Sequence, residues 1–96
     1  MSVYVIAQLQ FIDRSAYDRY QVRFIDVLHQ FAGRLLAADE HVMVLEGECT
    51  QDKVVVLSFS DEETFHAWSN SREYQEILAD RKAGANAVVL LVHGVS

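Results

Sequence analysis

The stretch KVVVLSF at residues 53–59 decides the fold of this chain. Valine is β-branched and fits a pleated surface, so the stretch predicts a strand. Four apolar residues in a row, Val54 to Leu57, leave this strand without a polar side. Residues 88–92, with the sequence VVLLV, repeat the pattern near the end of the chain. Strands that are apolar on both sides belong to a sheet with both faces covered, so this sheet needs a cover on each face.

A strand and a helix precede this stretch. Residues 3–12 alternate with a period of two, which predicts a strand. Asp13 stands where the N-cap of a helix belongs, because its carboxylate can accept from the free amides of a first turn. From Tyr17 to Phe31, apolar residues recur at steps of three and four, which is the stripe of an amphipathic helix. Gly33 is expected to end this helix in the left-handed conformation.

A second strand connects this helix to the decisive stretch. It begins at residues 35–37, is interrupted at residues 39–41 by a bulge or bend, and resumes over residues 42–46. The connection over residues 47–52 is short and polar. The sequence therefore predicts an antiparallel hairpin between this strand and residues 53–59.

The remainder of the chain predicts a second helical region and a last strand. Ser60-Asp61-Glu62-Glu63 has the form of a capping box, in which the serine and the final glutamate cap each other's amides. The helix pauses at residues 69–71 and stops near Gly84, and residues 87–95 form the last strand. The order βαββαβ predicts one α+β domain over residues 1–96, a ferredoxin-like fold with a four-stranded antiparallel sheet and two helices on one face.

The second face of this sheet predicts a dimer. Two helices cover only one face, yet residues 54–57 and 88–92, and also residues 42–45, are apolar on both sides. An exposed apolar face of that extent exceeds what monomers usually show to water. No spare segment of the chain is long enough to cover it. We therefore expect the chain to form a homodimer through the sheet face.

Composition narrows the possible partners. The formal net charge is −6 and no basic run offsets it, so we expect no binding to nucleic acid. The longest apolar run, residues 87–92, is far shorter than the roughly 20 residues that span a bilayer, so we expect no membrane segment. The first residues lack the pattern of a signal peptide. Cys49 is the single cysteine, which excludes an internal disulfide and fits a cytoplasmic protein.

Short segments spread along the chain resemble one bacterial family, the domain of unknown function thirteen-thirty, which lies within the dimeric α/β-barrel superfamily. Arg72 stands where that family typically has proline, which predicts a less rigid turn at this point. The matching segments are AYDRY at residues 16–20, GRLL at 33–36, VLEG at 44–47, AWSNSREYQ at 67–75, and Arg81.

The resemblance implies a ferredoxin-like protomer and a dimer that forms between sheets, and it implies no reaction. Relatives in the superfamily include cofactor-free monooxygenases, haem-degrading enzymes, lactone isomerases and ligand binders. Fold does not determine function. Three functions stay open: a protein or cofactor-independent enzyme that binds a small aromatic or carboxylated metabolite, a non-catalytic structural or interaction dimer, and a haem-using or oxygen-using enzyme of the monooxygenase kind.

Arg81 is the most unusual residue for its position. It lies at the centre of a helical stripe with Tyr74 and Ile77, where an aliphatic side chain is expected. A guanidinium on a core-facing stripe needs an acidic partner, and Glu46 is the best candidate because it continues the strand face of Val44. The pair predicts either a structural salt bridge or a pocket, in which Arg81 binds a carboxylate or enolate oxygen and Glu46 acts as a base.

Four aromatic residues with polar tips lie on helix faces that meet the sheet. They line a cleft for a flat ligand or simply complete the core. Neither a phosphate-binding loop nor the spacing of a metal site is present, so no cofactor and no metal are expected. Among the isolated histidines, His41 and His66 are the ones that a haem would require in the cleft. The aromatic residues are Tyr17, Tyr20, Trp68 and Tyr74.

Overall fold

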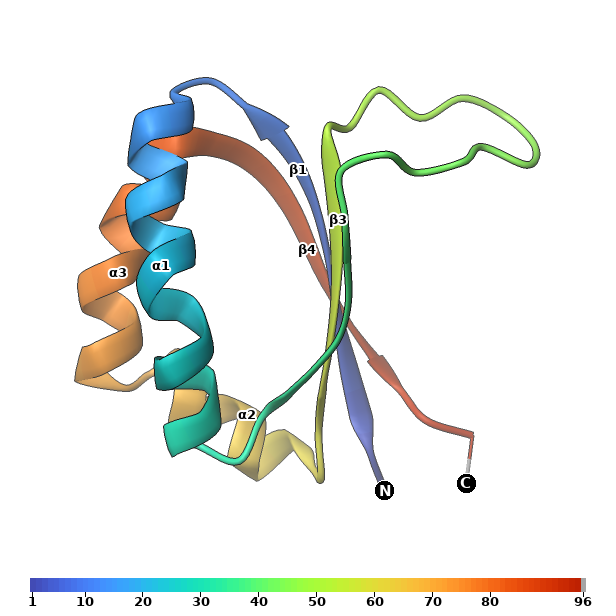
Figure 1. Ribbon diagram of the computed structural model, residues 1–96. Coiled ribbons are helices and arrows are strands. Elements are labelled where there is room, and N and C mark those ends of the chain that lie inside the picture. Colours follow the sequence, from blue (N-terminus) through green and yellow to red (C-terminus); the bar gives the residue numbers. More distant parts are fainter. Residues whose placement is uncertain (96) are drawn as a thin grey trace.

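In the computed structural model, which describes residues 1–95, three helices pack on one face of a four-stranded antiparallel sheet (Figure 1). The strand order is β2-β3-β1-β4, with antiparallel pairing throughout. This is the ferredoxin-like order, and the predicted fold is confirmed. The elements are β1 (Val3–Phe11), α1 (Arg14–Gln30), β2 (Arg34–Asp39), β3 (Lys53–Phe59), α2 (Glu62–Ser69), α3 (Arg72–Gly84) and β4 (Ala85–His93).

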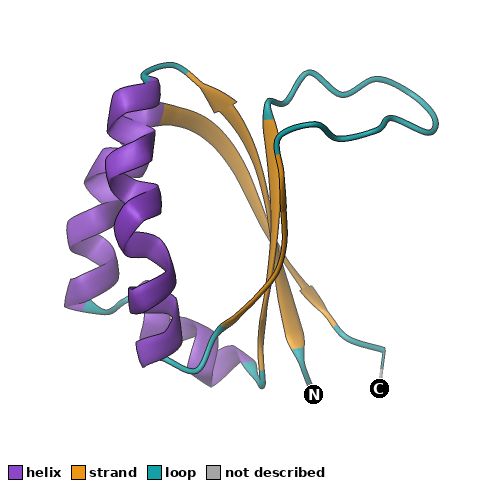
Figure 2. Ribbon diagram, viewed as in Figure 1, coloured by secondary structure: helices purple, strands orange, loops and turns teal. Residues whose placement is uncertain are grey.

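The second helical region is two helices rather than one, and all three lie in one layer (Figure 2). The Ser71 hydroxyl begins α3 by accepting from the Tyr74 amide at 3.0 Å, as an N-cap does. The cap of α2 is Asp61, which accepts from the Thr64 amide at 2.7 Å. The prediction that Ser60 caps this helix is wrong, because the carboxylate one residue later reaches the first turn.

Gly33 follows α1, but it does not adopt the predicted left-handed conformation. The left-handed residue after the helix is Ala32, with a φ of 60°. A Cβ on Gly33 would lie 2.3 Å from Leu28 Cδ1 and 2.7 Å from Phe59 Cε1. The glycine is needed because the chain passes close against the core. The predicted N-cap of α1 is confirmed, since Asp13 accepts from the Ala16 amide at 3.3 Å.

The core lies between the helices and one face of the sheet. Alternate residues of β1 and β3 point into it, and α1 and α3 supply Leu28 and Ile77, which are fully buried. No helix within residues 1–95 has both the length and the apolar character to span a bilayer. The buried strand residues are Val3, Val5, Leu9, Val55, Leu57 and Phe59.

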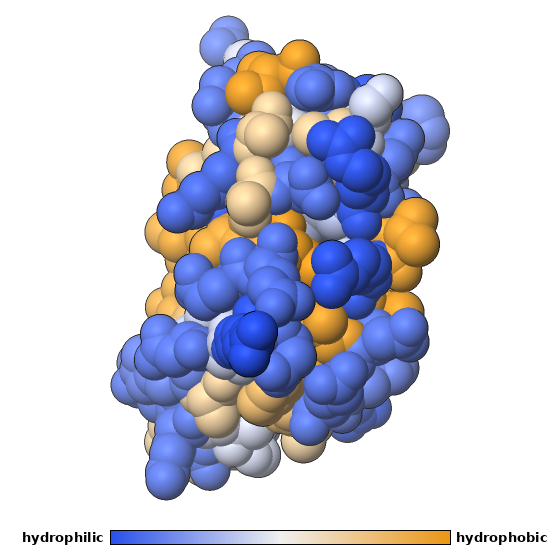
Figure 3. All heavy atoms as spheres, turned by 90° about the vertical axis from the view of Figure 1, so that its left-hand side faces the viewer, coloured by the Kyte–Doolittle hydropathy of each residue, from blue (hydrophilic) through white to orange (hydrophobic). Residues whose placement is uncertain are grey.

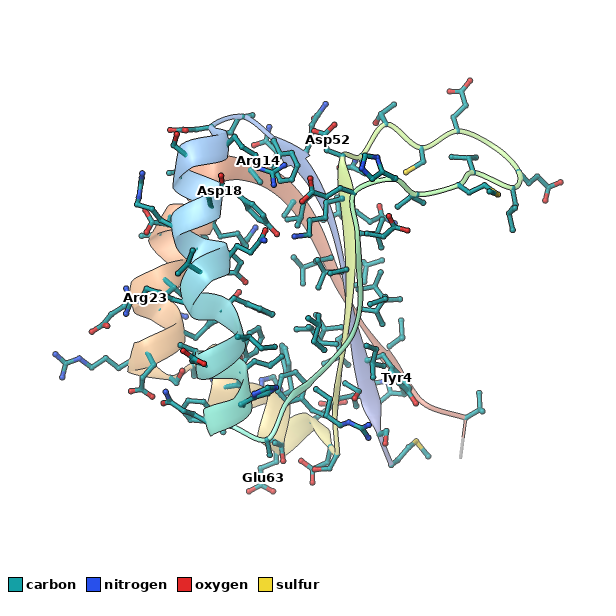
Figure 4. All side chains as sticks on the ribbon, in the orientation of Figure 1. Tyr4, Arg14, Asp18, Arg23, Asp52 and Glu63 are labelled. Atoms are coloured by element: carbon teal, nitrogen blue, oxygen red, sulfur yellow. The ribbon has the colours of Figure 1, made fainter. Side chains whose placement is uncertain are left out.

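The opposite face of the sheet is apolar and open. Ile6 pairs with Val56 on one side and with Leu90 on the other, and this row points away from the helices. Leu90 is 47% exposed and Val88 is 49% exposed. Figure 4 places Tyr4 on this side of the sheet. The outer side of the helical layer is instead largely hydrophilic (Figure 3). The predicted apolar second face is therefore present, and no residue between 1 and 95 covers it.

Residues 40–52 depart most from the sequence prediction. The strand does not resume at residues 42–46; β2 ends at Asp39 and the chain leaves the sheet as an extended arm (Figure 1). The irregularity of β2 lies between Leu35 and Ala37 rather than at residues 39–41. We call residues 40–52 the arm.

Candidate functional site

A cavity of about 510 Å³ lies between the helices and the sheet of the protomer. Its size falls in the range of pockets that enclose small organic ligands. The sheet forms one wall with small aliphatic side chains such as Val5, Ala7 and Val55. The helices form the other wall, chiefly with aromatic side chains. Both walls are thus largely apolar.

The aromatic wall is built around Trp68. Its ring centroid lies 4.0 Å from that of Tyr74 and 5.3 Å from that of Phe59. Phe24 meets the indole edge-on at 6.3 Å. Tyr20 meets Tyr74 edge-on at 6.5 Å. Such contacts fix the ring planes, so this wall is a preformed surface for stacking.

Two buried donors in this cavity wall have no partner. Arg81 Nε and Trp68 Nε1 are inaccessible to water, and neither donates a hydrogen bond to any residue between 1 and 95. A buried donor left unpaired costs about 1–3 kcal/mol. An acceptor that reached these atoms would recover that cost, so both atoms favour a ligand that carries oxygen.

Lys53 is a further cation of the cavity wall. It is 6% exposed, and its Nζ donates to Gln21 Oε1 at 3.0 Å. The nearest carboxylate oxygen, on Glu40, is 3.9 Å away, because Arg14 holds that carboxylate through hydrogen bonds of 2.8 and 3.0 Å. Burial lowers the pKa of Lys53, and the Arg14 guanidinium lowers that of Glu40. The ammonium of Lys53 is therefore only partly compensated.

The sequence contains a signal that places Lys53 in the core layer. Residues 53, 55, 57 and 59 alternate onto the helix-facing side of β3. A lysine in register with Val55 and Leu57 must enter the core layer, as Arg81 does from α3.

The side chains that line the cavity carry positive charge, whereas the chain as a whole is negatively charged. Its lining includes Arg81 and Lys53, and no aspartate or glutamate among the described residues. The chain as a whole has a formal charge of −6. A cleft with low-dielectric walls concentrates the field of the charges that line it. The lining therefore carries positive charge within an acidic protein.

The two cations lie at one end of the cavity. Lys53 Nζ lies 5.0 Å from the centre of the Tyr17 ring, and the charge of Arg81 acts on both Tyr17 and Tyr20. This is the end where α1 begins and α3 finishes, at the top of Figure 1. Trp68 belongs to α2 at the opposite end. The cavity thus has a cationic end and an aromatic end.

The buried tyrosines predict a loss of stability in alkali. Burial raises the pKa of Tyr17 to about 12, and that of Tyr20 well above its ordinary value of 10.0. A raised folded-state pKa of an acid means that its contribution is complete below pH 10 and is lost as pH rises through the folded value. We expect urea stability to fall from about pH 10 to 12. Tyrosinate absorbance, recorded on folded and unfolded protein, measures this difference.

Tyr17→Phe is the matched variant for this effect. It keeps the ring and removes the ionisable hydroxyl, so its stability should decline less over the same pH interval. If all four tyrosines of the folded protein titrate together near their ordinary pKa, the described burial is contradicted.

The structure brings most of the predicted site residues together. Tyr17, Tyr20, Trp68, Tyr74 and Arg81 all line the cavity. Both readings of the aromatic residues hold in part, because Tyr17 and Trp68 belong to the buried core and also face the cavity.

Glu46 is the exception. It lies in the arm, exposed to water, because the predicted strand that would have carried it to the sheet does not form. The protomer forms no Arg81–Glu46 pair within residues 1–95, and the idea of an intramolecular pair is corrected. The four histidines also lie outside the lining that the described residues form. His66 is exposed beside Glu62, and His41 is part of the arm.

Comparison with known proteins identifies a family. A family model described as Domain of unknown function (DUF1330) matches residues 2–95. No curated protein matches the sequence.

Three solved structures illustrate the fold. A protein of unknown function from Rhodopseudomonas palustris has a TM-score of 0.84 at 14% identity, covering 99% of this chain and 83% of that one. A dimeric ferredoxin-like protein of unknown function from Jannaschia sp. has a TM-score of 0.68 at 15% identity, covering 98% and 100%. A cofactor-independent oxygenase from Streptomyces nogalater has a TM-score of 0.65 at 11% identity, covering 99% and 94%. At these identities the likeness shows the fold alone.

Proposed function

The chain belongs to the DUF1330 family, and from that premise we propose that it is a homodimer whose protomers each bind a small aromatic carboxylate. One observation carries the proposal. The cavity wall holds the cations Lys53 and Arg81, the Nε of Arg81 and the Nε1 of Trp68 lack acceptors, and no carboxylate of the described residues lines it. A ligand that brings its own carboxylate supplies what this wall lacks.

The arrangement of the cavity defines the ligand further. The carboxylate belongs at the cationic end, where Arg81 and Lys53 donate to it, because charge-assisted hydrogen bonds are the strong ones. The aromatic body lies between the sheet and the rings of Trp68 and Tyr74. An oxygen at the far side of the ligand accepts from Trp68 Nε1. A flat aromatic acid with a hydroxyl or carbonyl group opposite its carboxylate fits all three requirements.

The titratable side chains that line the cavity favour a ligand-binding function over an enzyme that abstracts a proton. A general base needs a side chain that can accept a proton near neutral pH. Tyr17 and Tyr20 have raised pKa values and stay protonated, and Arg81 is permanently charged. Glu46, the base expected from the sequence, lies in the arm. Lys53 is the one remaining basic side chain among the described residues that line the cavity, and it already donates to Gln21.

The open face of the sheet supports the dimer. Burying apolar surface contributes about 25 cal/mol per Å². Leu90, Val88 and Val92 are each 40–49% exposed in the protomer. A second copy that presents the same face covers both sets at once, as a two-fold interface requires. The relative from Jannaschia sp. is itself described as dimeric.

A thermal-shift series tests the ligand class. Naphthoate, naphthamide and naphthylmethylamine share an aromatic body and differ in charge. We expect naphthoate to raise the melting temperature, the neutral amide to raise it much less, and the cation to leave it unchanged, because a ligand that binds only the folded state stabilises it by mass action. Equal shifts from naphthoate and naphthamide would refute the carboxylate preference.

A further inference from the structure

We infer that the arm of each protomer lies on a second copy of this chain, where residues 42–46 become a strand. The inference rests on the proposed dimer and goes beyond it, because it adds an interaction surface outside the sheet face. The arm begins after β2, ends before β3, and turns at Gly47, which has a φ of 86°.

The apolar side chains of the arm are exposed to water and need another surface to bury them. Val42 is 39% exposed, Met43 79%, Val44 46% and Leu45 89%. Single apolar residues on a surface are ordinary, but four in succession on a projecting segment mark an interaction site. Their neighbours in the protomer do not shield them from water.

The direction of the arm selects a second copy as the occupant. The arm projects from the sheet on the side opposite the helices (Figure 1). Tyr4, on the open face, points to that same side (Figure 4). A copy that covers the open face therefore lies directly beside the arm. The arm and the open face thus lie on the same side of the sheet (Figures 1 and 4).

The backbone of the arm is available for pairing. Its base is fixed, since Asp52 N donates to Leu9 O at 2.8 Å and Phe11 N donates to Asp52 Oδ2 at 2.8 Å. Between residues 42 and 51, no hydrogen bond to any described residue forms. Strands β2 and β4 are the edges of the sheet, and edge strands carry unpaired donors and acceptors. An extended segment added to such an edge satisfies both backbones.

The sequence and the charges agree with this placement. The β-branched residues of the arm predict a strand, and the protomer alone offers that strand no neighbour. The arm contains four acidic residues and neither lysine nor arginine. The open face has one cation in its register, Arg34, which pairs with Ser58 across the sheet and has no ion pair within residues 1–95. A second copy thus offers a basic contact to Glu46 and Glu48, the arm carboxylates that no residue within 1–95 engages. The acidic residues are Glu40, Glu46, Glu48 and Asp52.

The test compares the full-length protein with a Met43→Asp/Leu45→Asp variant and a Val22→Asp control. Val22 is 77% exposed on the outer side of α1, so the control places one such aspartate outside the arm. We expect the arm variant to raise the dissociation constant of the dimer about thirtyfold or more, and the control to leave it unchanged. Sedimentation measures this constant. The replaced residues are exposed in the protomer, so circular dichroism should show that the variant stays folded.

Hydrogen exchange gives a second readout of the arm. Amides of residues 42–46 should exchange slowly in the dimer and rapidly when dilution produces monomers. Rapid exchange in the dimer, or an arm variant that dimerises normally, overturns the inference. If Leu90→Asp dissociates the dimer while the arm variant does not, the sheet interface stands and the arm inference alone fails. A wild-type protein that is monomeric at every concentration overturns both.

Discussion

Arg81→Met should weaken naphthoate binding about thirtyfold or more and leave the unfolding temperature unchanged or higher. The binding loss follows because a charge-assisted hydrogen bond to a buried carboxylate is worth about 2 kcal/mol or more. The unchanged or higher unfolding temperature follows because Arg81 Nε has no hydrogen-bond partner among residues 1–95. The variant therefore removes a desolvated donor, and methionine keeps the apolar part of the side chain. Isothermal titration and thermal unfolding of the same preparations measure the two effects.

Lys82→Met is the matched control for Arg81→Met. Lys82 is the next residue of α3 and is exposed, so its replacement changes the net charge equally outside the cavity. Its affinity for naphthoate should match that of the wild type. A strongly destabilised Arg81→Met protein with normal affinity would instead mean that Arg81 is a structural residue.

Leu90→Asp should raise the dissociation constant of the proposed dimer about a hundredfold or more, which yields monomers at micromolar concentration. Leu90 lies on the open face in register with Ile6, and a carboxylate there would be buried without a partner in the interface. Because Leu90 is 47% exposed in the protomer, the monomer should stay folded. Sedimentation velocity reports the association state, and circular dichroism reports the fold.

The Val22→Asp protein is again the control for added charge, since it should sediment like the wild type. A Leu90→Asp protein that stays dimeric with unchanged affinity would show that the open face is not the interface.

The strands and helices were predictable because their signals are local. The valine-rich stretch at residues 53–59 became β3 with the same bounds, and the pause at residues 69–71 separates α2 from α3. The prediction of a strand at residues 42–46 is wrong for the protomer, and the reason is physical. Their composition favours a strand, but a strand also needs a hydrogen-bonded neighbour, and the described part of the protomer supplies none. Strand propensity depends on context that a single chain does not contain.

The candidate site was predictable in its aromatic part and less so in its polar part. Helical spacing placed Tyr20 and Trp68 on faces that meet the sheet, and both line the cavity. Glu46 was assigned through the strand that does not form, so the error followed from the fold. Lysine is usually exposed, so residue type alone does not predict that Lys53 is part of the site. Its position in the alternation of β3 nevertheless turns its side chain toward the core.

Trp68 offers the most direct measurement of the central claim, since it is the single tryptophan of the chain and lines the cavity, and its buried Nε1 has no partner among residues 1–95. The indole N–H resonance should be followed by nuclear magnetic resonance while a hydroxynaphthoate is added to wild type and to Arg81→Met. We predict a saturable downfield shift in the wild type as the indole gains an acceptor, and a much weaker response in the variant. An indole resonance that does not move at saturating ligand, or that moves equally in both proteins, would contradict carboxylate binding in this cavity.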